Sequence, residues 1–263
     1  MVTVCILGCG WFGMPLAQAL VRDGYSVNGS TTTPEKLERL SAEQIRPFLV
    51  DLSKDILPED FLQGDFLIIN VPPRSRAGDV GEYLRQMNLT ADKLRSSPVR
   101  RVIFISSTAV YPDLSRIVKE DDADASSGQY RAEGIFLNMK SPGTTVIRFA
   151  GLVGPGRHPG KFLSGKTTGG PTAPVNIIHL DDCVQIVRKS LKAKINEHIV
   201  FNACADLHPT KREFYSRMAE LLSLPAPVFN DSDTAFKIID NSRVKKFLGY
   251  EFIHKDPMQM DFQ

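Results

Sequence analysis

Three glycines near the N-terminus, Gly8, Gly10 and Gly13, have the spacing G-x-G-x-x-G. The apolar run before them (2–7) is typical of a strand buried on both faces, and apolar residues recur at helical spacing after them (14–20). In such a strand–turn–helix unit the glycines permit a tight turn, the approach of a pyrophosphate and close packing of helix on strand. The helix N-terminus would supply N–H groups to phosphates. We therefore predict a dinucleotide site here; the alternative is a glycine turn that serves packing alone.

Hydroxyl groups and one lysine follow the second predicted strand (25–30), at Ser30, Thr31, Thr32 and Lys36. In an NAD-selective unit, an acidic residue about 20 residues past the glycines would bind the ribose 2′-hydroxyl. No carboxylate stands at the tip of this strand, and the hydroxyls with the lysine could accept a 2′-phosphate instead. We therefore expect NADP or NAD, with NADP favoured. The same stretch also suits a helix start, and both interpretations can hold.

Short apolar runs alternate with helical patterns along the rest of the chain. The further predicted strands cover 45–50, 66–71, 101–106, 144–148, 175–179 and 199–202, and the helices cover 80–94, 127–139 and 181–191. This alternation predicts an α/β fold, a Rossmann-type doubly wound parallel sheet with helices on both faces. Ligands bind at the carboxyl ends of such strands. The cofactor contacts expected besides the three glycines and the second-strand hydroxyls are therefore Trp11, Phe12, Asp51, Asn70, Val71, Pro72, Ser106 and Phe149.

A loop-rich segment interrupts this alternation after residue 150. Residues 151–174 hold seven glycines and four prolines, and long ordered loops of this kind are usually functional. We predict an NAD(P)-binding domain over 1–150, completed by about 175–205, and a loop-rich and helical substrate region over 151–263. Arg157 and Lys161 are the candidate substrate contacts, because both could hold a phosphate or carboxylate; a solvated basic loop is the alternative.

The composition excludes several classes of protein. With 42% hydrophobic and 24% charged residues and a net charge of +2, the chain has no bias toward nucleic acid or membranes. The four cysteines are scattered without a metal-binding spacing, so we expect reduced thiols and no metal. His179, beside Asp181, is predicted to be structural rather than catalytic. Because the chain starts with a core strand and shows no leader, we expect a cytoplasmic protein. We further expect a monomer or homodimer that binds a small molecule.

Five segments resemble, in order, the extended short-chain dehydrogenase/reductases of the NAD(P)-dependent epimerase/dehydratase family. They are Ile-Ser-Ser-Thr-Ala-Val-Tyr (105–111), Val-Lys-Glu-Asp (118–121), Arg-Phe-Ala-Gly-Leu-Val-Gly-Pro-Gly-Arg (148–157), Ile-His-Leu-Asp-Asp (178–182) and Phe-Asn-Ala (201–203). The resemblance implies the Rossmann fold and a nicotinamide cofactor. It also implies catalysis by a Tyr-x-x-x-Lys helix and a serine, for which Ser107 is the match.

The tyrosine–lysine pair of that family has no match in this sequence. If Glu133 takes the family's acidic position, Gln129 and Ala125 occupy the lysine and tyrosine positions. If Tyr130 is the tyrosine, Gly134 occupies the lysine position. The chain therefore resembles the atypical branch of the family, which lacks Tyr-x-x-x-Lys, and Tyr130 with Ser107 remains the catalytic candidate.

Two functions follow as hypotheses. The first is an NAD(P)-dependent oxidoreductase or epimerase-like enzyme that acts on a small polar substrate, such as a sugar or an anionic compound. The second is a dinucleotide-binding sensor or partner-binding protein without hydride transfer, which the absent tyrosine–lysine pair favours.

Overall fold

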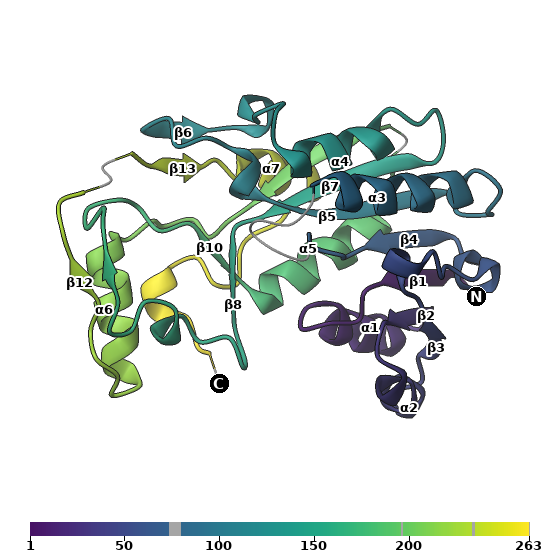
Figure 1. The fold of residues 1–263 in the computed structure, drawn as a ribbon, viewed down its shortest axis with the longest axis horizontal. Helices are drawn as coiled ribbons and strands as arrows, with labels where there is room; N and C mark the ends of the chain where they lie inside the picture. The colour runs from purple at the N-terminus through teal and green to yellow at the C-terminus, as the bar shows by residue number, and fades with distance from the viewer. Residues whose placement is uncertain (74–79, 196, 233–234, 263) are drawn as a thin grey trace. The chain divides into compact units, whose positions relative to one another are not determined.

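The computed structural model describes residues 1–73, 80–195, 197–232 and 235–262. The elements of its first half are β1 (Thr3–Leu7), α1 (Gly13–Arg22), β2 (Ser26–Thr31), α2 (Leu37–Ala42), β3 (Arg46–Leu49), β4 (Phe66–Ile69), α3 (Val80–Leu94), β5 (Arg101–Ser107), β6 (Arg116–Val118) and α4 (Gly128–Leu137) (Figure 1). Those of the second half are β7 (Gly143–Phe149), β8 (Gly151–Val153), β9 (Thr167–Thr168), β10 (Ile177–His179), α5 (Leu180–Lys192), β11 (Ile199–Ala203), α6 (Lys211–Leu221), β12 (Val228–Phe229), β13 (Lys237–Ile239) and α7 (Ser242–Leu248).

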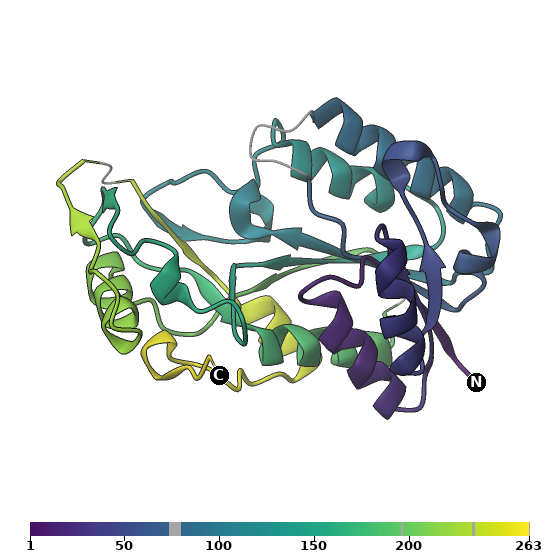
Figure 2. The ribbon, with the colours of Figure 1, turned by 60° about the horizontal axis from the view of Figure 1, so that its bottom comes forward.

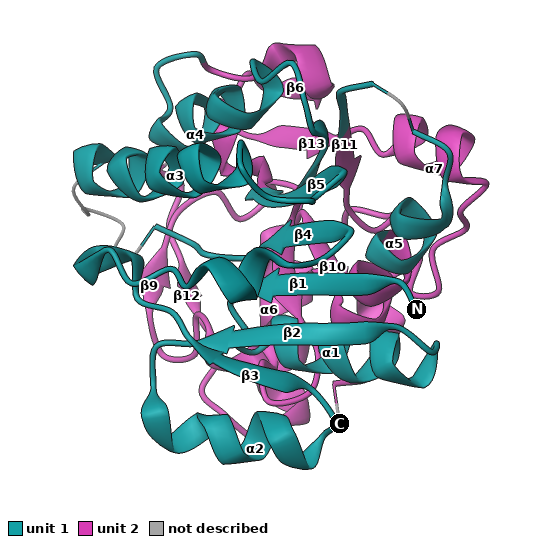
Figure 3. Ribbon diagram, turned by 90° about the vertical axis from the view of Figure 1, so that its right-hand side faces the viewer, with its two compact units in different colours: residues 1–106, 125–147, 187–200 teal, residues 107–124, 148–186, 201–263 magenta. Residues whose placement is uncertain are grey.

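A seven-stranded sheet runs in the order β11-β7-β5-β4-β1-β2-β3. The pairs β1–β2, β1–β4, β2–β3 and β4–β5 are parallel, and Figure 3 shows the strands from β5 to β3 side by side. The order reverses at β1, so that the chain leaves β1 toward β2 on one side and later returns to β4 on the other. This is the doubly wound, Rossmann-type arrangement, and it confirms the predicted fold class.

The chain forms two compact units, drawn in different colours in Figure 3. Unit 1 comprises residues 1–106, 125–147 and 187–200. Its core joins β1, β4 and β5 to α3 and α4, which lie next to each other (Figure 2). In this core the rings of Phe104 and Phe136 lie 5.3 Å apart. The end of α1 is linked to the last turns of α5, because Arg188 donates hydrogen bonds to the carboxylate of Asp23.

Unit 2 comprises residues 107–124, 148–186 and 201–263. It contains three two-stranded parallel pairs, β8–β10, β6–β13 and β9–β12. The short strands β8 and β9 lie in the stretch for which the sequence predicted only loop. At α6, Thr210 and Glu213 form the capping box that their spacing indicates.

A buried polar network connects three segments of unit 2. The Arg148 side chain is 1% exposed and donates to the Tyr111 hydroxyl at 2.6 Å and to the main-chain oxygen of Glu120 at 2.7 Å. The Tyr111 hydroxyl in turn donates to Asn202 at 2.5 Å. Since a buried charge is costly unless it is paired and hydrogen-bonded, these contacts fix the segments they join. None of the helices in the described part of the chain is long and apolar enough to cross a membrane.

Candidate functional site

The glycine turn after β1 has a shape that two of its glycines make possible. Gly8 has a φ of +106°, and a Cβ added there would lie 2.5 Å from the main-chain oxygen of Asn70. A Cβ added at Gly13 would lie 2.1 Å from the main-chain oxygen of Gly8. No atom lies within 4 Å of a Cβ added at Gly10. Gly8 and Gly13 are therefore required by the fold, whereas Gly10 faces open space that a ligand could enter.

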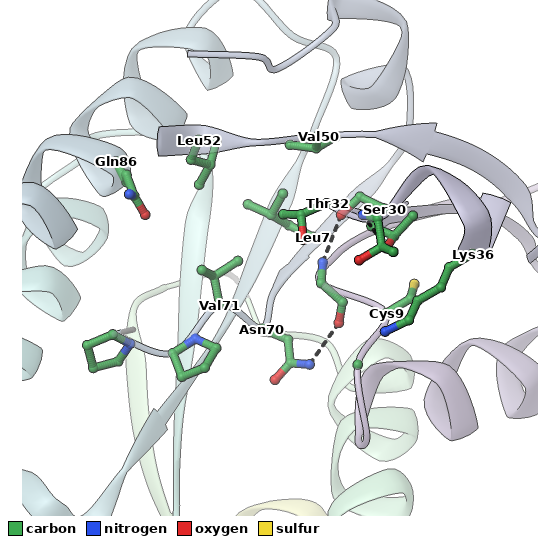
Figure 4. A pocket seen from close by; sticks show the side chains of 16 residues that line it. Leu7, Cys9, Ser30, Thr32, Lys36, Val50, Leu52, Asn70, Val71 and Gln86 are labelled. Atoms are coloured by element: carbon green, nitrogen blue, oxygen red, sulfur yellow. Dashed lines mark hydrogen bonds between the residues drawn. The ribbon is translucent and has the colours of Figure 1, made fainter. Parts of the chain in front are cut away.

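Residues at the ends of two neighbouring strands hold this turn in place. The Ser30 hydroxyl accepts the main-chain N–H of Gly8 at 2.8 Å, and the Asn70 amide donates to the main-chain oxygen of Gly8 at 2.9 Å; both bonds are drawn in Figure 4. The main-chain N–H of Cys9 also donates to the oxygen of Ser30 at 2.8 Å. The turn is thus fixed by strands β2 and β4, one on each side of β1.

A pocket of about 440 Å³ opens beside the turn, at the carboxyl ends of these strands (Figure 4). Such a volume lies in the range of small-molecule and cofactor sites. Its lining includes eight residues that the sequence singled out as cofactor contacts. They are Gly8, Gly10, Ser30, Thr31, Thr32, Asn70, Val71 and Pro72.

The sequence patterns do not mark seven further lining residues, and they mark Lys36 only for its charge. The seven are Leu7, Cys9, Thr33, Val50, Leu52, Pro73 and Gln86. Several of these residues are neighbours in the sequence of predicted contacts. Including one more residue on either side of each predicted contact would have identified them. Gln86 lies on α3, is 5% exposed and donates to Glu82 at 2.7 Å, and no motif marks it.

The lining of the pocket combines two kinds of surface. Leu7, Val50 and Leu52 contribute apolar side chains, while hydroxyl groups and Lys36 contribute polar ones. Lys36 is the only charged residue among the described residues that line the pocket, and its side chain reaches toward the glycine turn in Figure 4. Burial raises the pKa of the Cys9 thiol to about 12, so this side chain adds no negative charge. The pocket suits a ligand with an apolar part and an anionic part.

Several predicted cofactor residues lie outside this lining. Trp11, Phe12 and Gly13 belong to the glycine turn and the start of α1 but do not line the pocket. Asp51 accepts the N–H of Ser53 at 3.1 Å and so caps the turn 52–54.

Two other predicted contacts lie elsewhere. Ser106 donates to the buried carboxylate of Glu133 at 2.5 Å. Phe149 is buried and belongs to unit 2.

The two catalytic candidates fall in different units. Tyr130, 36% exposed, lines a second hollow of unit 1, which is formed by residues of α3 and α4 and by Ala125 and shares no lining residue with the glycine-turn pocket. Ser107 belongs to unit 2, where its hydroxyl accepts the N–H of Ala109 at 3.1 Å and caps the turn 108–110.

The two candidate substrate contacts lie in the glycine-rich segment of unit 2. The Arg157 side chain donates to the main-chain oxygen of Leu152 at 2.8 Å, and its guanidinium carbon lies 5.8 Å from the centroid of the Phe162 ring. Lys161 ends the turn Pro159–Lys161 and is exposed. Lys161 therefore has the more accessible charge.

The sequence matches no family model. Protein YeeZ of Escherichia coli (strain K12) is 37% identical over 276 aligned residues, which cover 100% of both chains. A structure of a functionally unknown conserved protein from Silicibacter pomeroyi is 25% identical with a TM-score of 0.77, over 98% of this chain and 96% of that one.

Two further solved structures have the same fold at lower identity. MoeE5 in complex with UDP-glucose and NAD has a TM-score of 0.78 at 21% identity, over 96% of this chain and 93% of that one. UDP-glucose 4-epimerase from Thermotoga maritima, with UDP-glucose, has a TM-score of 0.78 at 18% identity, over 96% and 94%. The likeness confirms the fold of the short-chain dehydrogenase/reductase superfamily that the sequence resemblance implied.

Proposed function

This chain belongs to the family of the Escherichia coli protein YeeZ, and from its fold we propose that it is a nicotinamide-dinucleotide-dependent oxidoreductase or epimerase-like enzyme. The observation that carries the proposal is the glycine turn beside the pocket. Gly10 leaves its side of the turn open, and α1 begins three residues later at Gly13. Diphosphates bind at such a turn, where main-chain N–H groups and the positive end of the helix dipole act together.

The residues of the pocket would position the two ends of the dinucleotide. Val50 and Leu52 suit the apolar face of an adenine ring, and Thr31 and Thr32 suit the adenosine ribose. The MoeE5 structure contains NAD, which supports a cofactor of this class. When bound, the nicotinamide supplies hydride transfer. The part of the protein is to hold the cofactor and to exclude water from it.

We propose that NADP is preferred over NAD. The described lining of the pocket has no carboxylate that would repel a 2′-phosphate or bind a free 2′-hydroxyl. Lys36 contributes a positive charge close to the hydroxyl groups of Thr31 and Thr32. An ammonium group and hydroxyl donors are the partners that a phosphate requires.

The substrate is proposed to be a small polar molecule, such as a sugar derivative or an anionic compound. MoeE5 and the Thermotoga maritima epimerase were solved with UDP-glucose, which supports this class. Lys161 and Arg157 of unit 2 are the proposed contacts for an anionic group. Tyr130 and Ser107 are the proposed proton-transfer residues, with Arg131, the next residue in α4, as a source of positive charge.

A dinucleotide-binding sensor without hydride transfer is the second candidate. It is favoured by Gln129 and Gly134 in the positions where a catalytic lysine is expected, and by the place of Tyr130 in a hollow separate from the glycine-turn pocket. In this case the same pocket would bind the cofactor, and a partner protein would recognise the cofactor-bound form of the chain.

A titration of NADPH and NADH fluorescence tests what both candidates share. Turnover then separates them. An oxidoreductase is expected to lower the NADPH absorbance with a carbonyl substrate, an epimerase to convert a sugar nucleotide into its epimer without net loss of cofactor absorbance, and the sensor to bind NADPH without turnover. Tyr130→Phe and Ser107→Ala should reduce any turnover at least about tenfold while NADPH binding is unchanged. Tyr25→Phe, at the residue before β2, is the matched control; turnover that neither candidate variant alters would exclude both residues.

A further inference from the structure

Two histidines and an aspartate that are distant in sequence meet in unit 2. His179 ends β10, Asp181 lies in the first turn of α5, and His254 lies in the C-terminal segment. Oδ2 of Asp181 is 3.3 Å from Nδ1 of His179 and 3.0 Å from Nε2 of His254. The centroids of the two imidazole rings are 3.9 Å apart. One potential ligand atom from each residue thus lies within 4.8 Å of the other two.

We propose that His179, Asp181 and His254 bind a divalent transition-metal ion of the zinc class. Two ligands of a tetrahedral zinc ion that each lie about 2.0–2.1 Å from the metal are about 3.3 Å apart. The two measured separations from Asp181 are close to that value, and the two imidazole nitrogens lie within 4.8 Å of each other. Imidazole nitrogens with one carboxylate oxygen form a donor set that zinc accepts.

The neighbouring carboxylate of Asp182 positions the segment that carries His254. It is fully buried and accepts the Tyr250 hydroxyl at 2.5 Å, the N–H of Ile253 at 2.7 Å and the N–H of His254 at 3.1 Å. These three bonds attach the C-terminal segment to the start of α5. His254 is therefore held beside Asp181 without a metal, and Asp182 orients a ligand rather than acting as one.

The position of the His179 ring suits a ligand. The residue is 3% exposed, so the ring is fixed by the residues that pack around it. Nδ1 accepts the N–H of Asp181 at 3.2 Å, a long bond that a cation would replace.

The solvent-accessible side chains of Asp181 and His254 give a cation access to the proposed site from solvent. The Asp181 side chain is 57% exposed and that of His254 is 18% exposed, so a cation could enter from solvent on this side. Three protein ligands leave one tetrahedral position for water. Cys183 lies two residues after Asp181 but is fully buried, and its sulfur is not among the three ligand atoms that meet.

Calorimetric titration of the metal-stripped full-length chain with zinc tests this proposal. We expect one ion per chain, with affinity reduced at least about 100-fold in Asp181→Asn and in His254→Gln. The matched control is His198→Gln, a histidine substitution in unit 1, which should leave zinc binding unchanged. No binding by the wild-type chain, or equal affinity in wild type and both ligand variants, would overturn the site.

Cobalt bound in place of zinc provides a second measurement, since its visible absorption spectrum reports the ligands and not the affinity. A tetrahedral nitrogen–oxygen site gives visible absorption, without the sulfur-to-metal charge-transfer band that a cysteine ligand would add. Circular dichroism of Asp181→Asn, whose altered side chain is mostly exposed, shows whether that variant is folded when its zinc binding is measured. The zinc site and the dinucleotide site are tested separately, because NADPH fluorescence in the same samples measures cofactor binding whether or not zinc binds.

Discussion

The Ser30 hydroxyl accepts the main-chain N–H of Gly8 at 2.8 Å, so the end of β2 holds the glycine turn that follows β1. Ser30 is 2% exposed, and no solvent can replace its hydroxyl easily. We expect Ser30→Ala to lower the free energy of unfolding by about 1–2 kcal/mol, because the Gly8 N–H loses its partner. NADPH binding should weaken as well. Urea denaturation measures the first effect, and Ser41→Ala, an exposed serine on α2, should be close to neutral.

Gly13 and Gly10 give a matched pair of substitutions. Gly13→Ala places a methyl group 2.1 Å from the oxygen of Gly8 and should destabilise the fold by about 1–3 kcal/mol. Gly10→Ala meets nothing within 4 Å and should leave the melting temperature unchanged, yet it should weaken NADPH binding at least about tenfold. Thermal melts and fluorescence titrations of both variants separate the two roles. A Gly10→Ala variant that binds NADPH as well as wild type would mean that the open side of the turn is not the diphosphate site.

Lys36 should decide the choice of cofactor. Lys36→Ala is expected to weaken NADPH binding about tenfold with little change for NADH, because the charge would contact only the 2′-phosphate. Lys36→Glu should reverse the preference. Lys36 is exposed, so neither variant should change stability. Arg39→Ala, an exposed cation further along the same segment and outside the pocket lining, is the control; equal losses for both cofactors in Lys36→Ala would contradict the NADP assignment.

The Asp23–Arg188 pair predicts an acid-dependent loss of stability. Hydrogen bonds from Arg188 lower the pKa of Asp23 below its usual value. A depressed carboxyl pKa adds stability that is present above the unfolded pKa of about 3.9 and is lost as the pH falls through the folded value. At pH 7, Asp23→Asn should therefore cost about 1 kcal/mol, and the difference from wild type should shrink below about pH 4. Denaturation at both pH values checks this; a difference that is independent of pH would refute it.

The fold was predictable because its signals are local. The run 80–94 has helical apolar spacing and forms α3 with those bounds, and the Thr210–Glu213 spacing forms the capping box it predicts. The glycine spacing likewise identified a turn whose shape the structure explains atom by atom. In these cases the residues that form the sequence pattern are also the residues whose contacts form the structure.

The rest of the site depends on contacts between distant segments. Asp51 stands at a strand end, as predicted, but its carboxylate accepts hydrogen bonds from the N–H and the hydroxyl of Ser53 and so caps the next turn. Gln86 reaches the pocket from α3 without a motif. His254 meets Asp181 only because the C-terminal segment binds Asp182, which no spacing in the sequence reveals.

The central claim is that the glycine turn binds a nicotinamide dinucleotide, and a fluorescence titration of the wild-type chain with NADPH tests it most directly. The account predicts saturable binding at one site per chain, tighter for NADPH than for NADH, and lost in a folded Gly10→Ala variant. Absence of binding up to millimolar NADPH and NADH, from a chain with a normal cooperative melt, would contradict it.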